Sequence, residues 1–329
     1  MTRLVLALCL LCFTACDAGP EDGEVWRFAI EETRGSVQDA YAQRFAEKIE
    51  QATGGEVDVI VYPYGTLGTS DHITEQLHNG TLDLATASPG HLGKLLPELQ
   101  VFLLHYALPD SAEESRRVLA DPRVRELLDA LYREKGLRYL TAFSEGWQVW
   151  TTRTPIRSPE DFEGVKFRVM TSPLLVAAYR AYGASPTPLP YSEVYGALQL
   201  HMIDGQVNPI FAIQEMSFYE VTDYLVFAGQ AQFFTTVAAN PEFVDDLSPE
   251  RRQLLFDTIA ELSGEIAEIE ERYNRERLQV ILDRKPGIEI IELDAEERAR
   301  FREASRPVRD VYLEMAGPRG RELLELLER

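Results

Sequence analysis

The sequence predicts an α/β fold of two lobes, with a central ligand cleft between them and a long helix that braces both. Two successive units of the 329-residue chain alternate strand-like and helix-like patterns, joined by short glycine-containing links, which is typical of mostly parallel sheets flanked by helices. Residues 249–285 keep a helical pattern interrupted only by Gly264, which is unusually long for a globular helix. Such sheets bind ligands at the carboxyl ends of their strands, so we expect the binding site in the crevice between the lobes.

The first unit begins with a strand at residues 26–30 and a helix whose apolar positions recur every fourth residue. Ser36 is the expected N-cap of this helix, and Gly54 with Gly55 ends it. The other elements expected in this unit are strands at residues 57–61, 82–85 and 137–143 and a helix at residues 71–79.

The second unit begins near Gly146. Its expected elements are strands at residues 148–152, 165–170, 202–207, 224–227 and 233–239, and helices at residues 173–182 and 192–200. A strand at residues 287–293 and two acidic helices follow the long helix. The predicted lobe I comprises residues 25–147 plus about 236–265, and lobe II comprises residues 148–235 plus about 266–329, including the C-terminal helices.

Residues 1–16 are predicted to be a lipoprotein-type signal peptide. Arg3 provides a positive charge, and residues 4–15 form an apolar run too short to span a bilayer. The sequence Phe-Thr-Ala-Cys-Asp ending at Asp17 resembles a bacterial lipobox, which makes Cys16 the predicted lipidation site; the alternative is that Cys16 only lies near an ordinary cleavage site. Residues 17–24 form a polar tether. We therefore expect a periplasmic protein that is anchored to a membrane through Cys16.

The composition limits the classes of partner and cofactor. The formal net charge is −21, which argues against nucleic acid and anionic lipid, because both require clustered lysine and arginine. The three cysteines all lie within the signal segment, so no disulfide is expected in the mature body. The five histidines are scattered, without the i, i+4 spacing of a helical metal site. We expect neither a metal nor a cofactor.

Two polar residues at the ends of strands indicate a site for a carboxylate. Arg168 lies in the strand-forming run of residues 166–170, and Asn208 ends the segment Asp204-Gly-Gln-Val-Asn208 before Pro209. A guanidinium accompanied by a side-chain amide suits a small carboxylate. Without further information, Arg168 could equally be a surface residue of the strand and Asn208 a turn residue. No nucleophile or phosphate loop lies nearby, so the sequence indicates ligand capture and not catalysis.

These residues, together with Tyr64-Gly-Thr-Leu-Gly68 and the long helix, resemble the exported solute receptors of the tripartite ATP-independent periplasmic (TRAP) transporters. The resemblance runs from Trp26 to the C-terminus and includes the family pattern of a strand-borne arginine followed by Asp-Gly-Gln-x-Asn-Pro. Within the family, the ectoine and hydroxyectoine receptors are the most similar. The resemblance implies a two-lobed periplasmic binding protein, with no enzymatic activity, that closes on one solute and delivers it to the TRAP membrane subunits. We expect it to act as a monomer.

The resemblance also implies roles for individual residues. Arg168 would clamp the ligand carboxylate and Asn208 would hydrogen-bond it. Glu32 would meet a positive group of the ligand, and Tyr191 and Phe234 would belong to an aromatic cage, which attracts a delocalised cation.

At three cage or clamp positions the sequence departs from its relatives. His91 replaces a phenylalanine and Ala212 a tryptophan of the ectoine receptors, which predicts a roomier and more polar pocket. Gln148 stands where many acid-binding relatives carry a second arginine, and Trp147 beside it is a candidate substitute for a missing cage ring. A single guanidinium together with Glu32 favours a monocarboxylate or a zwitterion over a dicarboxylate.

Two alternatives stay open at this point. The same cleft could belong to an exported ligand sensor or a hydrolytic enzyme, for which Glu32 and His91 are the only candidate catalytic groups and have no third partner. A TRAP receptor could also bind another organic acid, such as a sugar acid or an aromatic acid.

Overall fold

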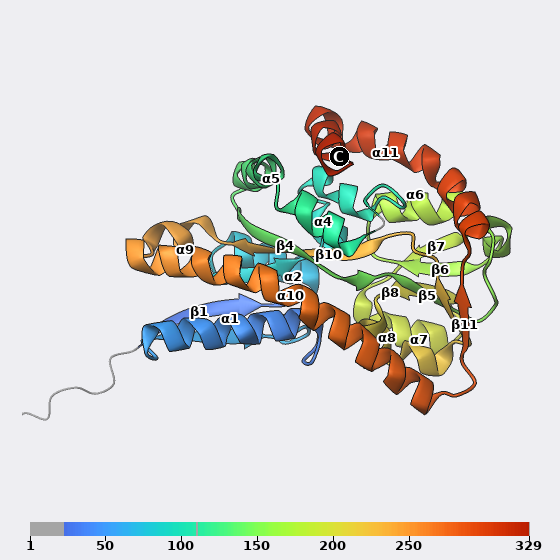
Figure 1. The fold of residues 1–329 in the computed structure, drawn as a ribbon, viewed down its shortest axis with the longest axis horizontal. Coiled ribbons are helices and arrows are strands. Elements are labelled where there is room, and N and C mark those ends of the chain that lie inside the picture. Colours follow the sequence, from blue (N-terminus) through green and yellow to red (C-terminus); the bar gives the residue numbers. More distant parts are fainter. Residues whose placement is uncertain (1–22, 110, 329) are drawn as a thin grey trace, which may run out of the picture.

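The structure, a computed structural model, describes residues 23–109 and 111–328 and has the two-lobed α/β fold that the sequence predicts (Figure 1). The predicted signal peptide, Cys16 and most of the tether lie outside the described residues. Each lobe is built on one sheet, with five strands in the first and six in the second. No helix in the described part of the chain is both long and apolar enough to cross a membrane.

The first sheet has the strand order β2-β1-β3-β10-β4. Strand β1 is parallel to β2 and β3, whereas β10 is antiparallel to β3 and β4. The strands are β1 (Glu24–Ala29), β2 (Val57–Tyr62), β3 (Leu84–Ala87), β4 (Arg138–Trp147) and β10 (Gln232–Ala239). Because β10 follows most of the second sheet in sequence, the chain returns to the first lobe to complete it.

The second sheet has the strand order β11-β9-β5-β8-β6-β7. Strand β6 is parallel to β7 and β8, and β5 is antiparallel to β8 and β9. The strands are β5 (Val149–Thr152), β6 (Lys166–Val169), β7 (Ser185–Pro188), β8 (Gly205–Asn208), β9 (Tyr224–Phe227) and β11 (Glu289–Glu292). The chain therefore crosses between the sheets at Gln148 and again between Phe227 and Gln232.

Helix α10 (Pro249–Arg284) connects the two lobes. Its N-terminus is fixed by Ser248, whose hydroxyl accepts a hydrogen bond from Arg251 N at 3.2 Å, and by Pro249 in the first turn. The helix packs against α1 (Val37–Thr53) and β4 of the first lobe and against α8 (Ile210–Glu215) of the second (Figure 1). The predicted brace between the lobes is confirmed.

Helix α11 (Ala295–Leu327) covers the opposite side of the molecule. It contacts the first lobe through the 3-10 segment Pro97–Leu103 and α5 (Pro122–Glu134), and the second lobe through α6 (Pro173–Ala181) (Figure 1). At Gly317 the backbone adopts φ 64°, which interrupts the helix and gives the two C-terminal helices that the sequence predicts.

The remaining helices are shorter than α1, α10 and α11. They are α2 (Ser70–His78), α3 (Pro89–Leu92), α4 (Ala112–Leu119), α5 (Pro122–Glu134), α6 (Pro173–Ala181), α7 (Val194–Gln199) and α9 (Pro241–Asp246). Three buried clusters of apolar side chains join these helices to the sheets.

The sequence-based assignment of elements was wrong in several places. The strand expected at residues 233–239 in the second unit, β10, belongs to the first sheet. The prediction missed β7, which contains two prolines that disfavour a strand by sequence alone, and the helices α3, α4, α5, α8 and α9. The strand expected at residues 202–207 begins only at Gly205, because His201 adopts φ 57° in a turn and Met202 is 60% exposed.

Candidate functional site

A narrow pocket lies between the lobes, at the carboxyl ends of strands from both sheets. The segment after β1 and helix α3 form one wall, and β6, β8 and the segment after β7 form the other. Its volume is about 30 Å³, roughly the share of one molecule in liquid water. It is lined by Glu31, Glu32, Gln38, Ser70, Ser88, His91, Arg168, Met170, Tyr191, Asn208 and Phe233.

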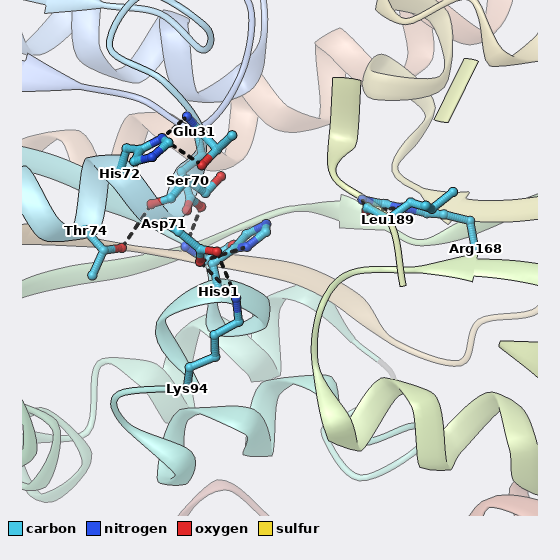
Figure 2. A network of polar contacts seen from close by, with 11 residues as sticks. Glu31, Ser70, Asp71, His72, Thr74, His91, Lys94, Arg168 and Leu189 are labelled. Carbon is cyan, nitrogen blue, oxygen red and sulfur yellow. Dashed lines mark hydrogen bonds and ion pairs between the residues drawn. The ribbon is translucent and has the colours of Figure 1, made fainter. Parts of the chain in front are cut away.

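Arg168 is the charged centre of the second-lobe wall. Its neighbours Phe167 and Val169 are fully buried, and Arg168 itself is only 2% exposed. The guanidinium donates two hydrogen bonds to a single acceptor, the carbonyl oxygen of Leu189, from Nε at 3.1 Å and Nη2 at 2.8 Å (Figure 2). No carboxylate among the described residues forms an ion pair with it, and burial lowers the pKa of Arg168 to about 10. A buried cation without a counter-charge favours an anionic ligand.

Asn208 lies on the same wall, at the last position of β8. It pairs with Val149 across the strand, and its side-chain Nδ2 donates to Gln206 Oε1. Since Nδ2 carries two N–H groups, one remains for a ligand. Pro209 follows and forms the N-cap of α8, so the strand ends at the pocket.

The first-lobe wall is acidic. The carboxyl group of Glu31 accepts a hydrogen bond from Ser88 N at 2.6 Å, and burial raises its pKa to about 7. Glu32 is 7% exposed, and burial, followed by the charge of Glu145, raises its pKa well above the ordinary value. Glu31 Oε1 and Glu32 Oε2 are buried and find no hydrogen-bond donor among the described residues. The second-lobe wall therefore carries a buried positive charge, and the first-lobe wall carries buried carboxyl groups. In the part of the chain that the structure describes, neither wall forms an ion pair with the other.

His91 completes the first-lobe wall. Its side chain is 13% exposed, its Nδ1 lies 3.9 Å from Asp71 Oδ1, and burial lowers the pKa of His91 to about 4, so the imidazole is neutral at pH 7 (Figure 2). The buried Nδ1 has no hydrogen-bond partner in the described part of the chain. The predicted polar residue at this position is therefore a neutral group that can donate or accept one hydrogen bond.

The aromatic residues divide between the pocket and the core. Tyr191 lines the pocket and forms edge contacts with Tyr64 and Phe218, each with ring centroids 5.9 Å apart. Phe234, predicted as part of the cage, instead packs in the core against Phe102 at 5.4 Å. Its neighbour Phe233 lines the pocket, because adjacent residues of a strand point to opposite faces and β10 also shifts register between the two.

Three further predicted residues do not line this pocket. Trp147 and Gln148, at the crossing between the sheets, line a separate cavity of about 700 Å³ beside α10. Ala212 is 1% exposed within α8, where it packs in the core with Phe211. The small residue at position 212 therefore borders the core and not this pocket.

The sequence analysis missed several residues that form the pocket. Three of them lie one or two positions from a predicted site residue: Glu31, Met170 and Phe233. The sequence pattern therefore located the right segments of the chain, but not every side chain that faces the pocket. Glu145 lies behind Glu32 and had no local signal, since only the fold brings β4 to the end of β1. No group of histidine, cysteine and carboxylate side chains that could hold a metal ion occurs in residues 23–109 and 111–328.

Comparisons with known proteins identify the class to which this fold and site belong. The family model for bacterial extracellular solute-binding proteins, family 7 (DctP), matches residues 28–315. The chain belongs to this family, whose members are receptors that bind solutes.

Similar proteins include the ectoine/5-hydroxyectoine-binding periplasmic protein of Ruegeria pomeroyi, which is 40% identical over 306 residues, covering 93% of this chain and 90% of that protein. Among solved structures, an apo open TRAP periplasmic solute-binding protein of Marinobacter aquaeolei is 43% identical, covers 93% and 100% of the two chains, and gives a TM-score of 0.88. The periplasmic ectoine-binding protein of a TRAP transporter of Halomonas elongata is 38% identical, covers 93% and 98%, and gives a TM-score of 0.89.

Proposed function

We propose that this protein is the extracytoplasmic receptor of a TRAP transporter for a small monocarboxylate or zwitterion, which it binds by closure of the two lobes and delivers to the membrane subunits. The observation that carries the proposal is the buried guanidinium of Arg168, which has no counter-ion within the described chain and lies across a narrow cleft from buried carboxyl groups. A ligand carboxylate would supply the negative charge that Arg168 lacks and would accept a hydrogen bond from the free N–H of Asn208.

The acidic wall favours a zwitterion over a dicarboxylate. A second carboxylate on the ligand would meet Glu31 and Glu32, which are already crowded and short of donors. A positive group would instead lie between these carboxyl groups and the faces of Tyr191 and Phe233. Ectoine carries one carboxylate and one delocalised positive ring, so it fits this division. The ectoine-binding relatives support the same ligand class.

The arrangement supports capture and not turnover. Catalysis would require a base or nucleophile held by a third group, whereas His91 has only a distant contact with Asp71, and the carboxyl group of Glu32 contacts another carboxyl group. We therefore propose that the protein has no enzymatic activity. We also propose that it is a monomer held at a membrane through a lipid on Cys16.

Ligand-dependent stabilisation tests the receptor proposal. Ectoine at about 100 times its Kd should stabilise the folded receptor by about 2.7 kcal/mol, which is measurable as a rise in Tm. Mass spectrometry after long incubation should recover the ligand intact. The proposal fails if neither ectoine nor any other small carboxylate shifts the Tm, or if an Arg168→Ala variant responds as the parent does.

A further inference from the structure

The carboxyl group of Glu145 lies behind the acidic wall and does not itself line the pocket. Glu145 is in β4, is fully buried, and accepts a hydrogen bond on Oε1 from Gln38 Nε2 at 2.9 Å. Its other oxygen, Oε2, has no donor among the described residues. The two carboxyl groups of Glu145 and Glu32 lie close enough together for the charge of Glu145 to be the second cause, after burial, of the raised pKa of Glu32. Glu145 can therefore influence a ligand only through pocket residues that it neighbours, Glu32 and Gln38.

Two carboxyl groups in buried contact cannot both remain ionised without a nearby cation. The cations that face the cluster are few: Arg277 lies 4.0 Å from Glu215, on the far side of the cluster, and Arg168 is on the opposite wall. Burial is the first cause of the raised pKa of both Glu32 and Glu145. Burial and the lack of a nearby cation both indicate that the pair carries a proton when no cationic ligand is bound.

We propose that Glu145 is a positioning residue that determines specificity: with Glu32 it holds one exchangeable proton in the free receptor, and the positive group of a zwitterionic solute displaces this proton on binding. The inference rests on the receptor function proposed above. In the exchange, the O–H bond of the protonated carboxyl group breaks and the proton leaves to solvent. The charge of the pair changes from −1 to −2, and the N–H groups of the ligand cation replace the proton as donors to Glu32.

A purely anionic solute gives the opposite response. It brings no positive group to Glu32, so the pair keeps its proton and the acidic wall stays partly neutral. The receptor then distinguishes the two ligand classes by pH: affinity for a zwitterion rises with pH, by up to about tenfold per unit while the free pair is protonated, and affinity for a monoanion does not rise.

Other groups face the pair and set the range over which it titrates. They come from the segment after β1, from α8 and from the second-lobe wall. These groups are Glu31, Glu215 and Tyr191, and Asp39 of α1 and Arg277 of α10 act in turn on Glu215. Glu31 and Glu215 add negative charge, which keeps the proton on the pair, whereas Arg277 partly offsets Glu215.

Isothermal titration calorimetry of the mature receptor, in two buffers of different ionisation enthalpy, measures the proton directly. With ectoine at about pH 7 we expect release of between a few tenths of a proton and one proton per ligand. With pyroglutamate, a monoanion of similar size without a positive group, we expect no release. Repeating the ectoine titration from about pH 6 to about pH 9 should show affinity that rises and then levels off.

Variants separate this role from a structural one. Glu145→Gln should abolish the proton release and flatten the pH profile for ectoine, and Glu145→Asp, which keeps a carboxyl group, should restore both. Glu270→Gln is the matched control, since Glu270 is also a partly buried carboxyl whose pKa is raised to about 7, but it lines the separate cavity beside α10. This control should release the same number of protons as the parent.

The outcomes distinguish this inference from the receptor proposal. Ectoine binding that is independent of pH and releases no proton from the parent protein overturns the role of Glu145 and leaves the receptor function intact. Binding of pyroglutamate without ectoine also overturns it. If neither probe nor any other small carboxylate binds, both proposals fail. The measurement on the parent protein decides the matter even if Glu145→Gln does not fold.

Discussion

The two walls of the cleft both bury ionisable groups, but the second-lobe wall keeps its charge and the first-lobe wall can lose it. On the second lobe, one guanidinium is buried with a single backbone carbonyl as its partner. On the first lobe, several carboxyl groups are crowded together and respond to burial by raised pKa values. The arginine cannot give up its charge at any physiological pH, whereas the carboxyl groups can take up protons.

This difference indicates a division of labour in recognition. The second-lobe wall is always positively charged, so every ligand should carry a carboxylate or another anionic group. The first-lobe wall is adjustable, because its charge depends on the proton it holds. Selectivity among carboxylates should therefore come from the acidic wall, and the experiments below test each wall separately.

Removing the fixed charge should have the largest effect. Arg168→Met keeps much of the side-chain volume but lacks the guanidinium, and we expect ligand affinity to fall by about 2 to 5 kcal/mol, roughly 30-fold to several thousand-fold. The free energy of unfolding of the free receptor should be unchanged or increase, because an uncompensated buried charge is lost. Calorimetry and urea denaturation measure the two quantities. Arg180→Met, on the exposed end of α6, is the control and should change neither.

The connection between the walls should be the next most sensitive feature. Gly146, at the end of β4, has φ 119°, and a Cβ there would lie 2.5 Å from Asn274 Nδ2 and 2.9 Å from Glu270 Oε1. Asn274 in α10 joins the lobes by donating to the carbonyl of Glu145 and accepting from Phe211 N. Gly146→Ala should therefore lower the free energy of unfolding by about 1 to 3 kcal/mol.

A second glycine of the same region gives the matched control. Gly264 is exposed within α10 and has no atom within 4 Å of an added Cβ. Gly264→Ala should stabilise the protein by about 0.5 to 1 kcal/mol, because alanine loses less entropy in a helix. Urea denaturation of both variants should give changes of opposite sign; two changes of the same sign would contradict the role assigned to Gly146.

The sequence predicted the second-lobe wall better than the first. Arg168 and Asn208 lie in a contiguous motif at the ends of strands, and the structure places both at the pocket. Their position follows from local order, because a residue at the carboxyl end of a parallel strand faces the cleft by the topology of the sheet.

The first-lobe wall depends on contacts that no local pattern records. Glu145 acts on Glu32 although β3 and β10 separate β4 from β1 in the sheet, so only the complete fold brings the two residues near each other. Phe233 lines the pocket and the predicted Phe234 does not, and the shift of register between them in β10 is invisible in the sequence of an apolar strand. Gln148 and Trp147 were expected at the pocket, but the crossing between the sheets turns them toward the cavity beside α10.

The titratable wall predicts how the stability of the free receptor depends on pH. Glu31 and Glu215 have pKa values of about 7, raised from 4.5 chiefly by burial, so the folded state holds protons that the unfolded state releases. Their stabilising contribution is complete below about pH 4.5 and is lost as the pH rises through 7. His91 and His105 act in the opposite sense, because their pKa values are lowered to about 4 and about 3, and their effect is complete above 6.5.

Above pH 6.5 His91 and His105 therefore no longer change the free energy of unfolding with pH, and only the buried carboxyl groups should change it. We expect the free energy of unfolding to fall between about pH 6.5 and pH 8, by on the order of 1 kcal/mol per pH unit. Urea denaturation at several pH values, without ligand, measures the slope. A saturating zwitterion should reduce the slope, and a free receptor whose free energy of unfolding does not change over this range would show that the acidic wall is already fully ionised.

The smallest effect should come from the contact where the walls touch. A Cβ at Gly90, on the first lobe, would lie 2.3 Å from Cε and 2.7 Å from Sδ of Met170 on the second. Because a methionine side chain can rotate away at little cost, Gly90→Ala should weaken ligand binding by less than about 1 kcal/mol. The free energy of unfolding should change less, since Met170 can move before the lobes close. Calorimetry of Gly90→Ala, alone and combined with Met170→Ala, tests this contact. The second substitution should recover part of the affinity that the first one loses. Additive losses of affinity would mean that the two residues do not meet in the closed receptor.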